Sequence, residues 1–413
     1  MLRKEHHRPS RLFIEPLGDM SFAIDMKNAN QFDIAVVGAG PVGLAAALAL
    51  GLCGYRVSLV GPLNPHQDER TSALLAGSID LLERIGVWQS IRDNAAPLQS
   101  LRIIDATDRL IRAPEVLFAS SEIGLEAFGF NTPNLALVAA LEKAVAESGV
   151  RRIVATVTDA VPGPDAVELA LSTNTAIEAS LVVGADGRRS QIRKAGGITT
   201  REWRHDQSAL VVNLRHSRSH HDTSTEFHTT SGPFTLVPLP GRRSSLVWVG
   251  RTNEVKSHAA LSDDELAVAI EKQSASILGS IEIDGKRQVF PLVGMNASRF
   301  AAERIALIGE AAHVFPPIGA QGLNLGYRDV SALANLLKDR PADPGSNADL
   351  TAYENARRGD VLSRTAAVEA LNRTLLSDFL PLQGLRGAGF FLLDRLTPLR
   401  RMIMRHGTAA ERL

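Results

Sequence analysis

Uncharged apolar runs mark the first strands of the chain. Residues 34–37 are apolar and mostly β-branched, the pattern of a strand buried on both faces in a parallel sheet. An Ala/Leu-rich helix without a charge follows at 44–50, and 56–60 has the pattern of the next strand. Further buried strands are predicted at 181–183 and 304–308. A strand, a helix and a second strand in this order predict a βαβ unit in an α/β fold.

Helical periodicity and strand alternation continue up to about residue 200. A helix after Arg70 is predicted to end at Gly86, a plausible C-cap, and an amphipathic helix covers 134–148. Alternating apolar and polar residues predict further strands at 101–105, 153–157 and 167–171. The last two of these lie on either side of a turn at 162–164.

The pattern of apolar and polar residues changes between about residues 203 and 291. Alternation there predicts an antiparallel sheet. Ser262 and Glu265 form a capping box at the start of a helix over 262–278. From 349 onward the chain is expected to be helical. The predicted strands are 208–215, 224–228, 234–238 and 245–250.

These patterns predict a discontinuous domain organisation. The N-terminal extension mixes charges and prolines and is expected to be disordered; Met20 and Met26 lie just ahead of the first strand, which raises the hypothesis of a later start. The predicted segments are an extension at 1–31, a cofactor-binding domain at 32–100, 130–202 and 292–345, an inserted substrate domain at 101–129 and 203–291, and a C-terminal helical region at 346–413.

Composition narrows the class of protein. The 413 residues contain 45 basic and 45 acidic residues, so nothing global indicates a nucleic acid partner. The single cysteine, Cys53, excludes an intrachain disulfide and fits a reducing, cytoplasmic compartment. No apolar run reaches the roughly 18 residues that a membrane span requires.

A glycine motif joins the first strand to the first helix. Gly38, Gly40 and Gly43 have G-x-G-x-x-G spacing, with Pro41 inside the motif. The first glycine allows a tight turn, the second lets a pyrophosphate approach the backbone, and the third lets the helix pack closely on the sheet. The phosphates would lie at the positive end of the helix. Because the motif stands between a strand and a helix, it predicts a dinucleotide site.

Other residues extend this prediction. Asp186 and Gly187 form a turn after the strand at 181–183, where the carboxylate could bind ribose or ribityl hydroxyls or hold its own backbone. Arg70 could neutralise a pyrophosphate, or it could be an ordinary surface arginine. Gly61 occupies the end of the second strand, where dinucleotide folds usually place an acidic residue for the adenosine ribose. Asp68 or Glu69 could substitute for it.

A third glycine-rich stretch follows the strand at 304–308. Gly319, Gly322 and Gly326 are spaced along a turn whose backbone can approach a flat ligand. A helix begins near Gln321, so its free N–H groups and positive dipole point toward such a ligand. Pro316 and Pro317 stiffen the loop. The histidines at 205, 216, 220, 221 and 228 match no standard ligand spacing, so no metal site is predicted.

The three stretches together resemble the single-component, FAD-dependent aromatic monooxygenases of the para-hydroxybenzoate hydroxylase class. Within that class the chain looks most like the ubiquinone-biosynthesis (2-polyprenylphenol) hydroxylases, from the segments at 68–74, 234–241, 319–329, 378–382 and 402–407. The resemblance implies a Rossmann-type FAD-binding domain with an inserted antiparallel-sheet substrate domain. It implies FAD contacts from Gly38, Gly40, Pro41, Gly43, Arg70, Asp186, Gly187, Gly309, Glu310, Ala311, Pro317, Gly319, Gln321, Gly322, Leu323 and Asn324.

The resemblance also implies a reaction. NAD(P)H would reduce the flavin, O2 would form a C4a-hydroperoxide, and its distal oxygen would attack an electron-rich carbon of a polyprenylated phenol or quinone precursor. His313 and the carbonyls of Pro316 and Pro317 are the nearest catalytic candidates by motif, although His313 could simply orient the loop. Glu310 replaces the aspartate usual in the class, so its charge is kept but displaced by one methylene.

Three alternatives stay open at this stage. The chain could hydroxylate a soluble aromatic compound, reduce an isoprenoid with a flavin, or serve as a non-catalytic flavin-fold protein. An apolar tail interleaved with arginines, from Arg386 to Arg405, could pack on the substrate domain or lie on an anionic membrane surface. The latter would place the protein peripherally on the inner face of the membrane, with other quinone-biosynthesis proteins as possible partners.

Overall fold

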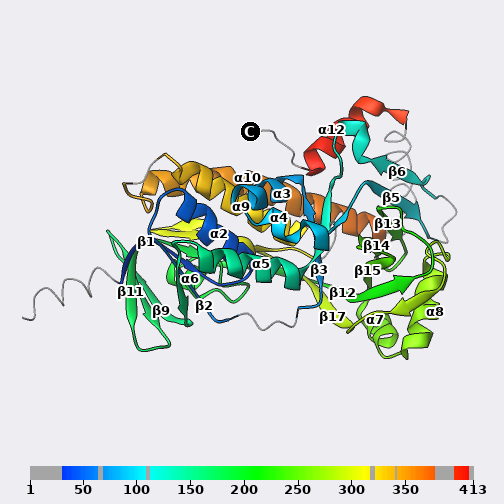
Figure 1. The fold of residues 1–413 in the computed structure, drawn as a ribbon, viewed down its shortest axis with the longest axis horizontal. Helices are drawn as coiled ribbons and strands as arrows, with labels where there is room; N and C mark the ends of the chain where they lie inside the picture. The colour runs from blue at the N-terminus through cyan, green and yellow to red at the C-terminus, as the bar shows by residue number, and fades with distance from the viewer. Residues whose placement is uncertain are drawn as a thin grey trace, which may run out of the picture.

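Two large sheets, joined by long helices, form the body of the molecule. The computed structural model describes residues 30–63, 68–107, 112–316, 321–339, 342–376 and 395–408. The first sheet lies at the left of Figure 1 and the second at the right, and helix α10 (Asn347–Leu376) runs along the top from one toward the other. The predicted N-terminal extension up to residue 29 and most of the apolar tail, 377–394, lie outside the described residues.

The first sheet is built on five parallel strands in the order β19-β11-β1-β2-β8. Its central strand β1 is buried over residues 34–37, as the uncharged sequence of that stretch predicts. Antiparallel strands extend it: β18 pairs with β19, and β10 links β11 to β9. The strands are β1 Gln31–Val37, β2 Val57–Gly61, β8 Arg151–Val154, β9 Val157–Pro162, β10 Val167–Leu171, β11 Ala176–Gly184, β18 Ala301–Ala302 and β19 Ile305–Leu307.

The second sheet is antiparallel except for one pair, β13 with β5. Its order is β20-β17-β12-β15-β14-β13-β5-β6, with β16 paired to β12. A separate three-stranded sheet has the order β3-β7-β4. The strands are β3 Thr71–Leu75, β4 Ala96–Pro97, β5 Ser100–Asp105, β6 Val116–Ala119, β7 Gly129–Pro133, β12 Thr200–His216, β13 Thr223–His228, β14 Pro233–Leu239, β15 Arg243–Arg251, β16 Ile281–Ile283, β17 Gln288–Ala297 and β20 His313–Val314.

The helices pack mainly around the first sheet. Helix α2 is buried from Gly43 to Leu50, which explains why it carries no charge. The capping box predicted at Ser262 is present, since its hydroxyl accepts from the backbone N–H of Glu265. The other helices are α3 Ala76–Arg84, α4 Trp88–Ile91, η1 Arg92–Asn94, η2 Ser120–Ile123, α5 Asn134–Glu147, α6 Gln191–Ala195, α7 Thr252–Ala259, α8 Asp263–Gln273, η3 Gly309–Ala311, α9 Gln321–Leu337 and α12 Thr397–Thr408, with α2 at Pro41–Leu52.

The α/β architecture with an antiparallel second sheet is confirmed, but three local predictions are wrong. A strand, β3, stands between Arg70 and the helix that ends before Gly86, because residues 71–75 pair with β7. The strand expected at 153–157 is divided between β8 and β9. The helix expected to reach 278 ends at Gln273, and Ala275 and Ser276 adopt positive φ angles. Strands β12 and β17 run across the predicted domain boundaries at 202/203 and 291/292.

Candidate functional site

The glycine loop after β1 lies against the turn after β11. Gly38 has a φ of +117°, and a Cβ there would come within 2.1 Å of the Ala185 carbonyl oxygen. A Cβ on Gly43 would come within 1.8 Å of the Gly38 carbonyl oxygen. Gly40 is the N-cap of α2, Pro41 is its first residue, and the space beside Gly40 is open. Close packing therefore requires two of the glycines, while the third leaves room at a helix N-terminus, where a phosphate binds favourably.

Asp186 and Gly187 form the neighbouring turn. One carboxylate oxygen of Asp186 accepts hydrogen bonds from the backbone N–H groups of Gln191, at 2.7 Å, and Ile192, at 3.3 Å. Its other oxygen, Oδ1, is buried and has no partner among the described residues. An unpaired buried acceptor is costly unless something donates to it. Asp186 thus holds its own turn through Oδ2, while Oδ1 is available as an acceptor.

The third stretch packs against the first. Gly309 and Gly326 both approach the side chain of Val42 on α2. Glu310 is exposed, and the carbonyl oxygen of Ala311 accepts from the Arg193 guanidinium at 2.9 Å. All three motifs therefore meet at the N-terminal end of α2.

The start of α9 is fixed by Asn324. Its Oδ1 accepts from the Leu75 N–H, at 2.8 Å, and from the Ser78 hydroxyl, at 2.6 Å, while its Nδ2 donates to the Ala73 carbonyl at 2.8 Å. Leu323 is partly buried and Gly322 lies beside open space. Pro317, Gly319 and the side chain of Gln321 lie outside the described residues.

His313 belongs to a buried ionic network. Its Nε2 lies 2.7 Å from Asp329 Oδ2, which also accepts from the Gly309 N–H at 2.9 Å. The other oxygen of Asp329 accepts from Arg357 Nε at 2.7 Å. Burial would raise the pKa of Asp329, but His313 and Arg357 outweigh it and lower that pKa. His313 is therefore an oriented residue whose Nδ1 is buried and unpaired among the described residues.

Asp329 and Arg357 were not singled out by the sequence analysis. The available signal was an acidic residue among apolar ones in α9, where Tyr327, Val330 and Leu333 are buried. Such a residue requires a partner. The partner comes from α10, 28 positions along the chain, which no local pattern indicates.

Arg70 lies on a short strap, residues 68–70, that leads directly into β3. Its guanidinium binds Asp68 at 2.6 and 2.7 Å and lies 5.1 Å from the Phe290 ring centre. The Asp68 hydrogen bond, with a smaller contribution from Glu310, raises the pKa of Arg70. Arg70 is thus placed near the third motif.

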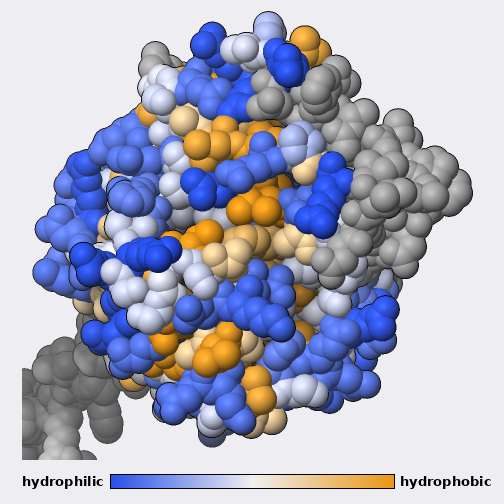
Figure 2. All heavy atoms as spheres, turned by 90° about the vertical axis from the view of Figure 1, so that its right-hand side faces the viewer, coloured by the Kyte–Doolittle hydropathy of each residue, from blue (hydrophilic) through white to orange (hydrophobic). Residues whose placement is uncertain are grey.

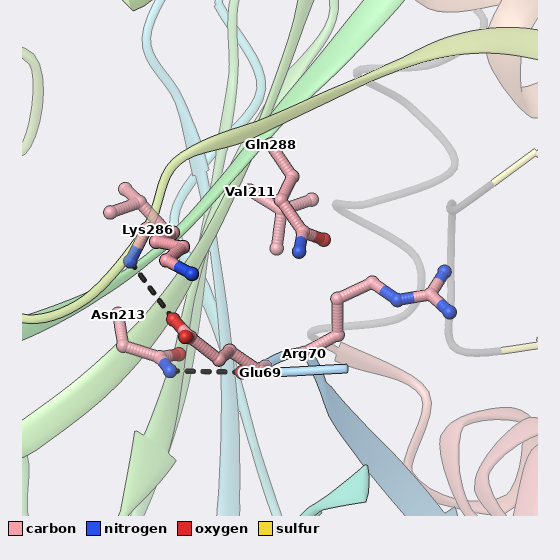
Figure 3. Close-up of a pocket in the computed structure, with 7 residues that line it drawn as sticks. Glu69, Arg70, Val211, Asn213, Lys286 and Gln288 are labelled. Atoms are coloured by element: carbon pink, nitrogen blue, oxygen red, sulfur yellow. Dashed lines mark hydrogen bonds between the residues drawn. The ribbon is translucent and has the colours of Figure 1, made fainter. Parts of the chain in front are cut away.

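Glu69 anchors this strap to the second sheet. Figure 3 shows its carboxylate accepting from the Lys286 N–H at 3.0 Å and its carbonyl accepting from Asn213 at 3.1 Å, with Arg70 extending away. The hollow between the strap and the second sheet has a volume of about 10 Å³, which is room for about one water molecule. It is therefore a contact between the strap and the sheet and not a ligand pocket. Asp68 and Glu69, the suggested substitutes for an acidic residue at Gly61, are both bound within the protein.

A small cluster of apolar side chains, the apolar wall, lies where the third motif meets the second sheet, and three of its members have no exposed surface. Ala209, Val249 and Leu292 of the sheet pack with Val368 of α10, and Phe315 packs against this group. Phe315 also lies edge-on to His313, with ring centres 5.6 Å apart. The sequence analysis missed this wall because its members come from four separate elements.

The histidines that the sequence analysis considered as metal ligands hydrogen-bond to other groups of the protein. His216 and His220 hydrogen-bond to backbone carbonyls, while His228 and His205 face Glu226 and Glu369. Within the described parts of the chain, no group of three His, Cys, Asp or Glu residues could hold a metal ion.

The donor set fits FAD. The loop at Gly40 can receive a pyrophosphate, the unpaired Oδ1 of Asp186 can accept from a sugar or ribityl hydroxyl, and Gly322 leaves open space at the start of α9. These three features lie on the motifs that meet at α2.

Comparisons with known proteins agree with this geometry. Residues 31–366 match the family model described as an FAD binding domain. Ubiquinone hydroxylase UbiL of Rhodospirillum rubrum is 33% identical over 92% of this chain and 90% of that protein. The 3-demethoxyubiquinol 3-hydroxylase of Escherichia coli is 29% identical over 91% and 97%, respectively. Among solved structures, p-nitrophenol 4-monooxygenase PnpA from Pseudomonas putida has the same fold, with a TM-score of 0.74 and 19% identity over 93% of this chain and 100% of that chain.

Proposed function

This chain belongs to the family of FAD-dependent ubiquinone-biosynthesis hydroxylases, and from that premise we propose that it hydroxylates the aromatic ring of a polyprenylated phenol or quinone precursor. O2 supplies the oxygen atom and NAD(P)H the electrons. The observation that carries the proposal is Phe315, a partly buried aromatic side chain at the edge of the apolar wall, next to the flavin motifs. An aromatic ring with an apolar polyprenyl chain packs more favourably against such an apolar side chain than a charged soluble compound does.

The protein's part in this reaction is binding, orientation and exclusion of water. Bound FAD supplies the oxygen-transfer chemistry. The glycine loop and Asp186 hold the cofactor, and Asn324 fixes the helix that borders the ring system. Phe315 and Val368 keep water from the reacting carbon. His313, held by Asp329, orients the loop; Pro316 follows Phe315 in that loop, and its carbonyl and that of Pro317 are the other groups proposed near the ring.

The test is mass spectrometry of the quinone pool in cells that lack this gene. We expect a prenylated ring intermediate short of one oxygen, restored to the final quinone by the wild-type gene. The structure of that intermediate would name the carbon. An unchanged pool would overturn the substrate assignment and favour a soluble aromatic compound. A flavin-dependent isoprenoid reductase would instead oxidise NAD(P)H without consuming O2 in step.

We further propose that α12 brings the protein to the inner face of the membrane. Its inner side packs on the second sheet, because Arg400 pairs with Glu122 at 2.7 Å and Met404 is buried against Phe118. Its outer side carries Met402 and Ile403, 61% and 43% exposed, beside the exposed Arg401. Figure 2, in which the right-hand side of Figure 1 faces the viewer, shows hydrophobic residues interleaved with hydrophilic ones on that face of the molecule. No helix in the described ranges is long and apolar enough to cross a membrane.

Binding to phosphatidylglycerol vesicles at low salt tests this surface. We expect the wild type to sediment with the vesicles and Met402→Glu/Ile403→Glu to lose at least about tenfold in binding, because the apolar side of an interfacial helix supplies the affinity. Val268→Glu, on exposed α8, is the matched control and should bind like the wild type. A wild-type protein that stays in the supernatant would refute the membrane proposal.

A further inference from the structure

The end of β2 has no space for the acidic side chain that dinucleotide folds usually carry there. Gly61 is the last residue of β2 and is buried. A Cβ at this position would lie 2.7 Å from the backbone nitrogen of Ala39 and 2.8 Å from its Cβ. Ala39 is part of the phosphate loop, so β2 and that loop touch backbone to backbone. The adenosine end of the cofactor therefore needs a different means of support.

An arginine from the next strand occupies this place. Arg152 lies on β8, which pairs with β2, and its Nη1 donates to the Gly61 carbonyl at 2.8 Å. Its Nη2 donates to the Pro62 carbonyl at 2.9 Å. One rigid guanidinium thus holds two successive carbonyls at the point where the strand ends.

The arginine is itself held in place. Its side chain is only 16% exposed, and Nε lies 3.6 Å from Glu142 of α5. Nη1 also donates to the Ile153 carbonyl at 3.1 Å. A half-buried guanidinium with this many partners has little freedom, so the backbone it binds is also restrained.

We propose that Arg152 is a positioning residue for the adenosine half of FAD. It fixes the Gly61–Pro62 backbone beside Ala39 and so keeps the end of β2 in the shape that receives the adenosine ribose. The backbone, held by Arg152, takes the place of the usual carboxylate. This inference depends on FAD binding and not on the ring substrate, so it can fail while the proposed function stands.

Flavin binding to the apoprotein separates this role from a general structural one. FAD and FMN share the isoalloxazine ring and ribityl phosphate, but FMN lacks the adenosine half. We expect Arg152→Met to weaken FAD binding, followed by flavin fluorescence, by roughly tenfold, the loss expected for hydrogen bonds to a charged group. FMN binding should be unchanged. The Kd of ADP for the apoprotein should rise by about the same factor as the Kd of FAD, because both ligands carry the adenosine half.

Two further variants complete the test. Arg151→Met, an exposed neighbour on the same strand, should bind both flavins like the wild type. Arg152→Lys retains the charge but cannot span two carbonyls, so it should also lower the ratio of FAD to FMN affinity; it serves as the main variant if Arg152→Met fails to fold. An equal loss for FAD and FMN, or an unchanged FAD affinity, would overturn the proposal.

Discussion

Replacing Gly61 with glutamate is expected to abolish FAD binding, although it installs the residue that dinucleotide folds usually have at this position. The new Cβ would lie 2.7 Å from the Ala39 nitrogen, so either β2 or the phosphate loop must move. Overpacking of this kind costs about 1–3 kcal/mol. The displaced loop would also carry its N–H groups away from the pyrophosphate. We expect FAD affinity to fall by more than about a hundredfold, measured by fluorescence titration of the apoprotein.

Two companion variants identify the cause. Gly61→Ala adds only the clashing carbon and should reproduce most of the loss. Gly149→Ala adds a carbon where nothing lies within 4 Å and should leave FAD binding unchanged. A Gly61→Glu protein that binds FAD as tightly as the wild type would mean that the backbone yields and that the carboxylate regains its usual role.

Replacing Asp329 with asparagine is expected to lower the free energy of unfolding by about 3 kcal/mol, as for a buried ion pair that loses one partner. Asp329 is 1% exposed and joins α9 to His313, to Gly309 and to Arg357 of α10. Without its charge, the buried Arg357 keeps one acidic partner among the described residues, Asp360 at 2.8 Å. Urea unfolding of the apoprotein measures the effect.

The size of this loss should depend on pH. The pKa of Asp329 is lowered in the folded protein, because His313 and Arg357 outweigh the effect of burial. Its ionised form therefore stabilises the fold above the unfolded pKa of about 3.9, and this contribution disappears as the pH falls through the lower folded pKa. The difference in stability between the wild type and Asp329→Asn should thus be full at pH 6 and shrink below about pH 4.

An ion pair with an exposed carboxylate provides the control, although the Arg304 side chain in it is only 12% exposed. Asp343 binds Arg304 at 2.9 Å, but its side chain is 46% exposed. Asp343→Asn should cost less than about 1 kcal/mol, as surface ion pairs usually do. Equal losses for the two substitutions would show that the Asp329 network is not a buried ionic centre.

The sequence by itself determined the elements whose pattern is local. The uncharged strand at 34–37, the alanine-rich helix after it and the capping box at Ser262 all appear where their spacing predicts, because hydrophobic periodicity and capping act within a few residues. The glycine spacing also predicted the tight turn at Gly38, which has a φ of +117°, and the close packing at Gly43. Strand β3 was missed because its partner strand β7 is 54 to 62 residues away in the chain.

Only the tertiary structure decided which side chains meet. Arg152 reaches Gly61 because β8 pairs with β2, and Asp329 reaches Arg357 because α9 and α10 pack together. Neither pair has a sequence spacing that predicts it. The physical reason is that each buried charge or strand end needs a partner, but the packing of distant elements chooses that partner. Sequence could thus specify where the cofactor motifs begin, whereas the folded chain specified what holds them in place.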